Sequence, residues 1–175
     1  MPWGCKIDMV HDLSDMVEDL KLASEVGIYT LAHDIHKELV DRIEQGDQSW
    51  PPSSEVTKWL KGGEKPLVNS GDFKKAIEIR VDKQTAYVGI LSPFGNRGQD
   101  MEMIARVIEG GAIIPVTDKM RGWFAARGFP LRKTTAAIII PARPVFGPSI
   151  ATLEEKVDEV FGPLLDEIGI RSVEF

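Results

Sequence analysis

The chain has little cysteine, no long apolar run and a deficit of positive charge, and each shortage excludes a class of protein. Cys5 is the single cysteine among 175 residues, so no disulfide can close within the chain, and a reducing compartment suits it. No apolar segment approaches the ~18–20 residues of a membrane span, which predicts a protein without membrane contact. The first residues lack the apolar core of a signal peptide, and we expect a cytosolic protein.

The charge is unevenly distributed along the chain. The formal net charge of −6 argues against a protein that mainly coats nucleic acid. Residues 8–47 hold eleven acids and three bases, residues 119–133 hold five bases and no acid, and residues 153–175 hold seven acids and two bases. Such segments can pair within a subunit or between subunits, although charged runs are also the ordinary solvated faces of helices.

The length of 175 residues predicts one domain, residues 1–175, with enough chain for a core. The apolar fraction of 43% and the charged fraction of 27% are typical of soluble globular proteins. Within the domain we distinguish an acidic helical N-terminal part (8–46), a sheet-containing body (66–148) and a C-terminal helix (149–169).

Apolar residues at three- and four-residue steps predict helix over residues 9–43. Ser24 and Gly27 interrupt the pattern, so the segment is either one long kinked helix or a helical pair. Gly46 is expected to end it. Trp50 lies in the following stretch QSWPPSS and indicates a loop packed onto the body rather than a free linker.

Alternation of apolar and polar residues from Ile77 to Val81, followed by a second apolar run over 86–91, predicts a β-hairpin. An edge strand containing a proline is predicted at 113–116 and a further strand at 134–140. The fold class that follows is α+β: a small antiparallel or mixed sheet with a hairpin, packed by N-terminal, middle and C-terminal helices. Helices after the hairpin are predicted at residues 101–108, 117–127 and 149–168.

The histidines do not predict a metal site. His33 and His36 stand three residues apart on a predicted helix, which is a spacing that metal ligands can use. A zinc site needs at least one more ligand, and His11 has no motif around it. Two solvent-facing helix histidines are therefore the favoured interpretation.

A catalytic centre is not indicated either. Asp72 followed by Glu78-Ile79-Arg80 resembles part of a nuclease core, but six residues of extended chain span about 20 Å, too far for both acids to hold one metal ion. The sequence contains no glycine-rich phosphate loop and no nucleophile elbow. We expect no enzymatic activity, cofactor or metal, and a metal-dependent nuclease or hydrolase stays open as an alternative.

The basic stretch KMRGWFAARGFPLRK, residues 119–133, interleaves aromatic and basic side chains. Arginine with tryptophan is typical of protein-interface hot spots, which favours a protein-interaction surface. Core packing with a solvated basic rim and a nucleic-acid-binding module with stacking aromatics are the alternatives. The candidate interface residues, with Arg143 added for the reason below, are Lys119, Arg121, Trp123, Arg127, Arg132 and Arg143.

Arg143 lies in a stiff segment directly after the predicted strand at 134–140. Pro141 ends the hydrogen-bonding ladder, and Pro144 forces Arg143 into an extended backbone. The side chain therefore leaves from a segment with little backbone entropy to lose on binding. It is either a solvated residue at a strand end or a contact presented to a protein partner.

Five sequence segments occur in a fixed order between residues 35 and 150: QSWPPSSEVTKWLKGG, PLVNSGDFKKAI, EGG, IIPVTDKMRGWFAARGFPLRK and IIIPARPVFG. In this order they resemble the phage virion morphogenesis family, the tail-completion (neck) proteins of Mu-like and P2-like tailed phages. The combination of IPVTDKMR with IPARPVFG carries most of the resemblance, and the acidic N-terminal helices match it least.

The resemblance implies a non-enzymatic structural component at the head–tail joint, assembled in the host cytoplasm and retained in the virion. Such proteins act as rings, commonly hexameric, so the implied partners are copies of this chain, a tail tube or terminator protein, and the head connector. DNA would pass through the lumen without specific binding. A ring of head-to-tail contacts needs two complementary patches on each subunit. We therefore expect Arg121, Arg127 and Arg143 to face acids of a neighbouring subunit or a virion partner.

Overall fold

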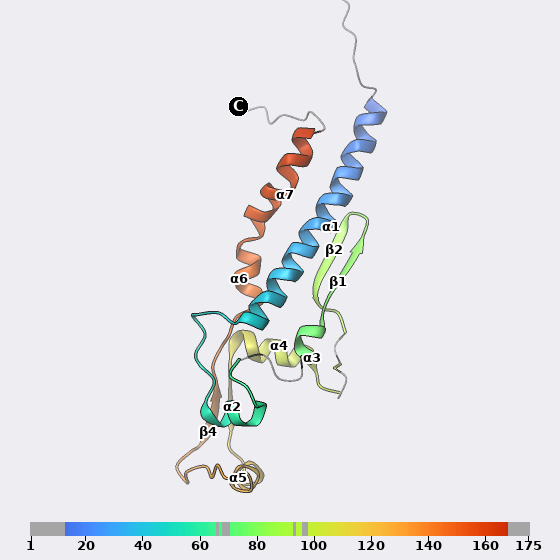
Figure 1. Ribbon diagram of the computed structural model, residues 1–175. Helices are drawn as coiled ribbons and strands as arrows, with labels where there is room; N and C mark the ends of the chain where they lie inside the picture. Colours follow the sequence, from blue (N-terminus) through green and yellow to red (C-terminus); the bar gives the residue numbers. More distant parts are fainter. Residues whose placement is uncertain (1–12, 66, 68–70, 93, 96–97, 168–175) are drawn as a thin grey trace, which may run out of the picture.

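The computed structural model describes residues 13–65, 67, 71–92, 94–95 and 98–167 (Figure 1). These residues form seven helices and two antiparallel two-stranded sheets, which confirms the predicted α+β class. The strands divide between two separate sheets, so no single sheet organises the fold. Within the described ranges, no helix combines the length and the apolar character needed to cross a membrane.

The N-terminal segment is one helix, α1 (Leu13–Gln45), and not a helical pair. Gly27 lies within this helix and leaves room for the C-terminal helix, since a Cβ there would lie 2.5 Å from Cε1 of Phe161. The helix ends as predicted at Gly46, whose φ of 80° is left-handed and whose N–H donates to the Arg42 carbonyl at 3.0 Å. The predicted residues 9–12 lie outside the described part of the chain.

The C-terminal segment, expected as one helix over 149–169, is divided into α6 (Phe146–Ala151) and α7 (Leu153–Glu167). Thr152 separates the two, and its hydroxyl donates to the Ser149 carbonyl at 3.3 Å. α7 packs along α1, where the ring of Phe161 lies over Gly27, and residues 168 and 169 lie outside the described part.

The predicted hairpin is present as β1 (Ile77–Asp82) and β2 (Thr85–Ile90), paired from Ile77 with Ile90 to Asp82 with Thr85. It lies along α1 on the side away from α7 (Figure 1). The second sheet is the ribbon of β3 (Ala112–Pro115) and β4 (Ala137–Ile140). β4 begins at residue 137, so the predicted strand at 134–140 is shorter than expected.

Four further helices connect these parts: α2 (Glu55–Lys61), α3 (Asp72–Lys75), α4 (Met101–Gly110) and α5 (Asp118–Ala125). The core lies where the C-terminal half of α1 meets the start of β1, α4 and the segment after β4. Its buried residues are Leu39, Ile43, Trp50, Phe73, Ala76, Ile77, Met101 and Val145.

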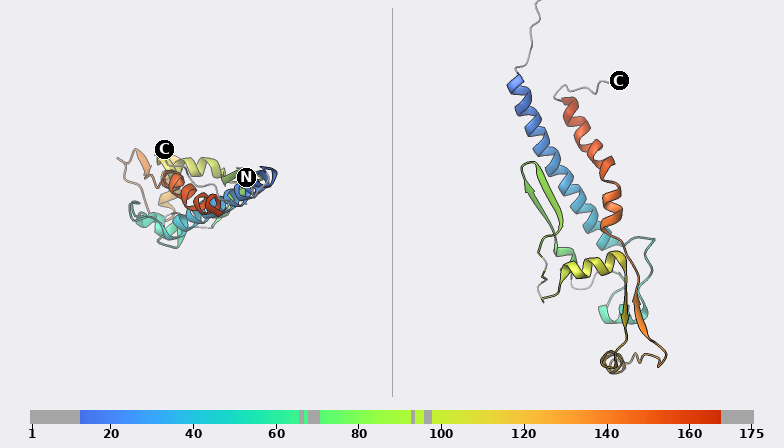
Figure 2. Two further views of the ribbon diagram at one scale, coloured as in Figure 1. Left: turned by 90° about the horizontal axis from the view of Figure 1, so that it is seen from above. Right: turned by 180° about the vertical axis from the view of Figure 1, so that it is seen from behind.

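The molecule is elongated, with chemically different ends (Figures 1 and 2). At one end α1 and α7 project beyond the core as a two-helix arm. At the other end the β3–β4 ribbon carries α5 and the loop that follows it. We call these parts the arm (residues 13–29 and α7), the stem (the β3–β4 ribbon) and the tip (residues 117–136).

Candidate protein-interaction surface

The tip holds the predicted basic stretch on a short capped helix. The hydroxyl of Thr117 accepts a hydrogen bond from Met120 N–H at 3.3 Å and begins α5. Gly128, with a φ of 82°, turns the chain after the helix, and Phe129 N–H donates back to the Phe124 carbonyl at 3.0 Å. The ring of Phe129 lies edge-on to Trp59 of α2 at 5.0 Å, so α2 braces the tip.

Arg121 holds the tip together. Its guanidinium donates to three backbone carbonyls of the returning loop: Arg132 at 2.9 Å, Thr135 at 2.6 Å and Lys133 at 3.4 Å. These contacts fix the loop against α5 within one chain. The predicted interface role of Arg121 is thus joined by an internal structural role that its sequence neighbours did not reveal.

Trp123 and Arg127 form a preassembled surface pair. The guanidinium of Arg127 stacks over the Trp123 ring at 3.7 Å from the ring centroid, and its Nη1 donates to the Trp123 carbonyl at 3.3 Å. Trp123 is 41% exposed. A cation over an indole face is stabilising even at exposed sites, so the pair presents an ordered apolar and cationic contact surface.

The remaining tip cations are Lys119, Arg132 and Lys133. All three are exposed, and none makes an ion pair or side-chain hydrogen bond within the described part of the chain. Residues 117–136 hold five bases and one acid, Asp118, so the tip carries a net positive charge. The tip therefore favours an anionic partner.

The stem below the tip is apolar on both faces. Ile113 and Ile139 are cross-strand partners on one face, and each is 72% exposed. Ile114 and Ile138, paired on the other face, line an open groove of about 620 Å³ beside α4. Sequence reasoning missed this surface, although the two apolar runs of three and four residues in short strands were its signal.

Arg143 lies at the base of the stem and not at the tip. Its Nε and Nη2 donate to the Pro51 carbonyl at 3.2 and 2.9 Å, and Nη2 also reaches the Pro52 carbonyl at 3.5 Å. Burial lowers the pKa of this guanidinium, which stays charged at neutral pH. The structure therefore gives Arg143 a partner within its own chain, and its contact with a second protein stays a prediction.

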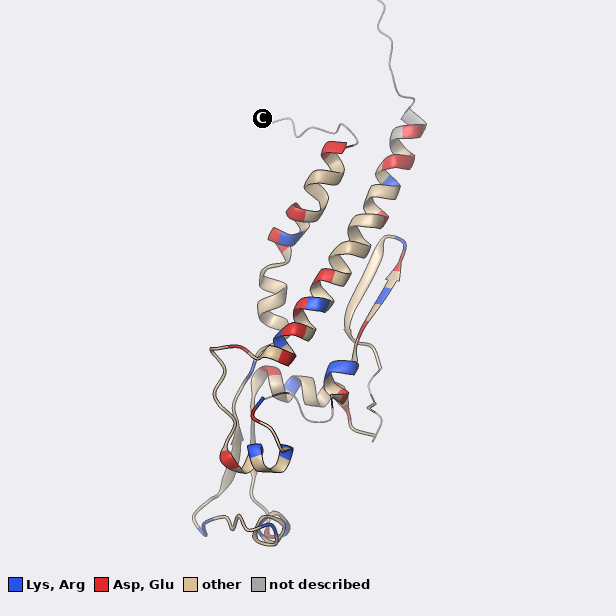
Figure 3. Ribbon diagram, viewed as in Figure 1, with Lys and Arg blue, Asp and Glu red and all other residues tan. Residues whose placement is uncertain are grey.

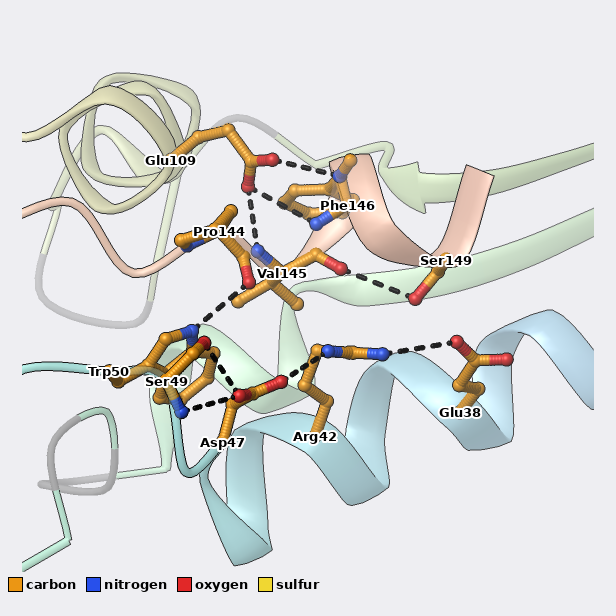
Figure 4. A network of polar contacts seen from close by, with 11 residues as sticks. Glu38, Arg42, Asp47, Ser49, Trp50, Glu109, Pro144, Val145, Phe146 and Ser149 are labelled. Atoms are coloured by element: carbon orange, nitrogen blue, oxygen red, sulfur yellow. Dashed lines mark hydrogen bonds and ion pairs between the residues drawn. The ribbon is translucent and has the colours of Figure 1, made fainter. Parts of the chain in front are cut away.

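The segment after Arg143 is a junction between distant parts of the chain (Figure 4). The Glu109 carboxylate accepts hydrogen bonds from the N–H groups of Val145, Phe146 and Gly147 at 2.8, 3.1 and 2.8 Å. The indole N–H of Trp50 donates to the Pro144 carbonyl at 3.3 Å, which confirms that the QSWPPSS loop packs onto the body. The QSWPPSS loop and the segment after Arg143, both singled out from the sequence, thus meet at the base of the stem.

The loop is also tied to the end of α1 (Figure 4). The Asp47 carboxylate accepts hydrogen bonds from the N–H and hydroxyl of Ser49 at 2.8 and 2.7 Å and from Nη1 of Arg42 at 2.6 Å. Hydrogen bonds from Ser49 lower the pKa of Asp47, despite partial desolvation. Nη2 of Arg42 also lies 3.5 Å from Oε1 of Glu38, so the polar contacts of the junction extend into α1.

The arm carries the opposite charge to the tip (Figure 3). Residues 13–29 of α1 hold four acids and one base, and α7 holds six acids and one base. Arm and tip lie at opposite ends of the molecule, so they cannot pair within one subunit (Figures 1 and 3). Pairing within one subunit is thereby excluded for these residues, and pairing between subunits stays a prediction beside ordinary solvation of the charged faces.

The residues considered as metal ligands or catalytic groups make structural contacts instead. His36 Nε2 lies 3.0 Å from the Ile77 carbonyl at the start of β1, and His33 stacks on Tyr29 with ring centroids 4.3 Å apart. Residues 72–75 form α3 and not the extended chain assumed for the distance between Asp72 and Glu78. Among the described residues, no three His, Cys, Asp or Glu side chains are placed to hold a metal ion.

Comparisons with protein-family models, with curated proteins and with solved structures find no match to this chain. The likeness to the phage virion morphogenesis family therefore rests on the sequence segments, and what it implies about function stays a proposal.

Proposed function

We propose that the protein is a structural, non-catalytic virion assembly protein that acts at the head–tail joint of a tailed phage, as a tail-completion or neck component. The observation that carries the proposal is the separation of an acidic arm and a basic tip at opposite ends of one elongated subunit (Figure 3). The resemblance of the segments that build the tip and its junction supports the same assignment.

Two different, complementary ends are what head-to-tail association requires. A contact between unlike patches leaves one free patch of each kind, so further copies add until the rotation closes a ring. The implied state is a homo-oligomeric ring, hexameric in the form that the resemblance gives. A tail tube or terminator protein and the head connector would contact its two faces.

The tip is not suited to line a DNA channel. Unpaired cations such as Lys119, Arg132 and Lys133 would bind backbone phosphates and slow the passage of DNA. We therefore place the tips at contacts between proteins, with DNA passing through the lumen without specific binding.

A nucleic-acid-binding module is the second candidate, because the same tip combines free cations with the exposed Trp123–Arg127 pair. Aromatic faces and cations bind single-stranded nucleic acid without sequence preference. The acidic arm and the net charge of −6 weigh against this function.

Negative-stain electron microscopy of the purified full chain, combined with assays of plasmid cleavage and DNA binding, tests the proposal. We expect closed rings, no cleavage with added Mg²⁺ or Mn²⁺, and weak DNA binding. A monomer that nicks DNA only with divalent metal would establish the nuclease or hydrolase instead. Tight DNA binding that weakens steeply with salt, without rings, would favour the nucleic-acid-binding module.

A further inference from the structure

The arm contains a groove between its two helices. It has a volume of about 380 Å³ and is lined by Asp19, Leu22, Ala23 and Val26 of α1 and by Leu164 and Glu167 of α7. A volume of this order is at the small end of binding pockets, which run from ~300 to 1,000 Å³, and fits one or two side chains rather than a helix.

Exposed apolar side chains and two carboxylates line the groove. Leu22 is 62% exposed and Val26 is 45% exposed. The two carboxylates of the lining, Asp19 and Glu167, are exposed and have no ion pair or hydrogen bond to another side chain in the described ranges. Neighbouring apolar side chains left in water favour association, and the carboxylates select for a cationic partner.

The tip has the complementary chemistry. Trp123 supplies an apolar ring that already carries the Arg127 guanidinium on its face. Indole and guanidinium groups are the most frequent anchors of protein interfaces, and this pair is ordered before binding. Lys119, four residues before Trp123 on α5, and Arg132 of the same tip are both exposed and supply further cations.

We propose that the Trp123–Arg127 pair of one subunit docks into the arm groove of a neighbouring copy, with Lys119 and Arg132 facing Asp19 and Glu167. The inference rests on the proposed function and names the two surfaces that make its head-to-tail contact. A second copy is the occupant because the groove and the tip carry opposite charge and lie at opposite ends of the same chain (Figure 3). DNA does not fit the groove, since its phosphates and these carboxylates repel each other.

Charge reversal at each end gives a direct test. The tip variant carries Lys119→Glu and Arg132→Glu, and the arm variant carries Asp19→Lys and Glu167→Lys. A control variant carries Lys75→Glu and Arg80→Glu, two exposed cations of the α3–β1 region away from both ends. All substituted positions are exposed, so circular dichroism should report native helix content for every variant.

Assembly of the full-length variants is measured by light scattering at low salt. Each end variant alone should assemble more than about tenfold less tightly than the wild type, since like charges then meet at the contact. An equimolar mixture of the two should recover assembly, because an acidic tip meets a basic arm at one contact and a basic tip meets an acidic arm at the next. The control should assemble as the wild type does.

The outcomes separate the inference from the proposed function. If the wild type forms rings and the end variants do so equally well, the function stands and this docking is wrong. If the folded end variants fail alone and also in the mixture, this docking is again wrong. If tip reversal abolishes only DNA binding, the tip binds nucleic acid. A wild type that stays monomeric in all conditions contradicts both.

Discussion

Glu109 determines how the chain leaves the stem. One carboxylate accepts hydrogen bonds from three successive N–H groups, those of Val145, Phe146 and Gly147, at the start of α6. The first N–H groups of a helix have no partner within the helix, so a carboxylate from another element both satisfies them and fixes the direction of the helix. Glu109 thereby couples α4 to the C-terminal helices.

We expect Glu109→Ala to lower the free energy of unfolding by about 1–3 kcal/mol, because three hydrogen bonds to a charged acceptor are lost. Glu102→Ala is the matched control on the same helix: its carboxylate is exposed, pairs with Arg106 and should contribute less than about 0.5 kcal/mol. Urea unfolding followed by circular dichroism measures both. Equal losses in the two variants would contradict the capping role.

Arg143 and Arg132 are both predicted interface residues, but their contacts differ. Arg143 has hydrogen-bond acceptors in its own chain, whereas the Arg132 side chain has no partner among the described residues. Arg143→Ala should lower the free energy of unfolding by about 1–2 kcal/mol, since the carbonyl of Pro51 loses a charged donor. Arg132→Ala should leave unfolding unchanged within about 0.5 kcal/mol and weaken assembly. An Arg143→Ala protein with wild-type stability but impaired assembly would favour the interface role of this residue over the structural one.

At the scale of elements, α1 is the support for most of the structure. The hairpin lies along one side of it and α7 along another, and Lys156 of α7 pairs with Glu38 of α1 at 3.0 Å. At Gly27 the ring of Phe161 lies directly against α1. The Gly27–Phe161 contact and the Lys156–Glu38 ion pair are two of the contacts that hold α7 against α1.

Gly27→Ala should lower the free energy of unfolding by about 1–2 kcal/mol, because the ring of Phe161 must move from its place against α1. Phe161→Leu in the same chain should recover part of the loss. Gly122→Ala, in α5 with open space around it, should instead stabilise by about 0.5–1 kcal/mol. Thermal unfolding distinguishes these outcomes, and a neutral Gly27→Ala would show that the helices are not in close contact there.

The Glu38 ion pair predicts a pH dependence. Burial raises the pKa of this carboxyl, but hydrogen bonds from Lys156, Ser149 and Arg42, together with the charge of Lys156, outweigh burial and bring the pKa below its usual value. A lowered pKa gives stability that is fully present above the unfolded value of about 4.3 and is lost as the pH falls through the folded value. Glu38→Gln should therefore unfold at lower urea concentration than the wild type at pH 7, with a smaller difference at pH 3. A constant difference would contradict the assignment.

The sequence predicted elements with local signals and missed contacts between distant segments. The hairpin followed from the alternation between Ile77 and Val81, and the end of α1 from Gly46. Nothing local shows that β3 pairs with β4 in a sheet of its own, or that the helix after residue 146 breaks at Thr152. Arg143 was singled out from the prolines around it, but its acceptor, Pro51, lies 92 residues away and has no sequence signal.

At the scale of the whole molecule, the candidate interaction surface has two parts, the basic tip and the acidic arm, which lie at opposite ends of the subunit. The basic stretch and the acidic segments were visible in the sequence, whereas their distance from each other follows only from the projecting arm and stem (Figures 1 and 3). A subunit with opposite charges at its ends associates with copies of itself more readily at low ionic strength, because exposed charges are screened over ~8–10 Å at physiological salt.

The central claim is that the chain works by head-to-tail association of its ends. Sedimentation velocity of the wild-type full chain, over a range of protein and salt concentrations, tests it most directly. We predict one discrete oligomer, consistent with a closed ring, that dissociates to monomers as salt is raised. A chain that sediments as a monomer at every protein concentration, or whose oligomer is indifferent to salt, would contradict the account.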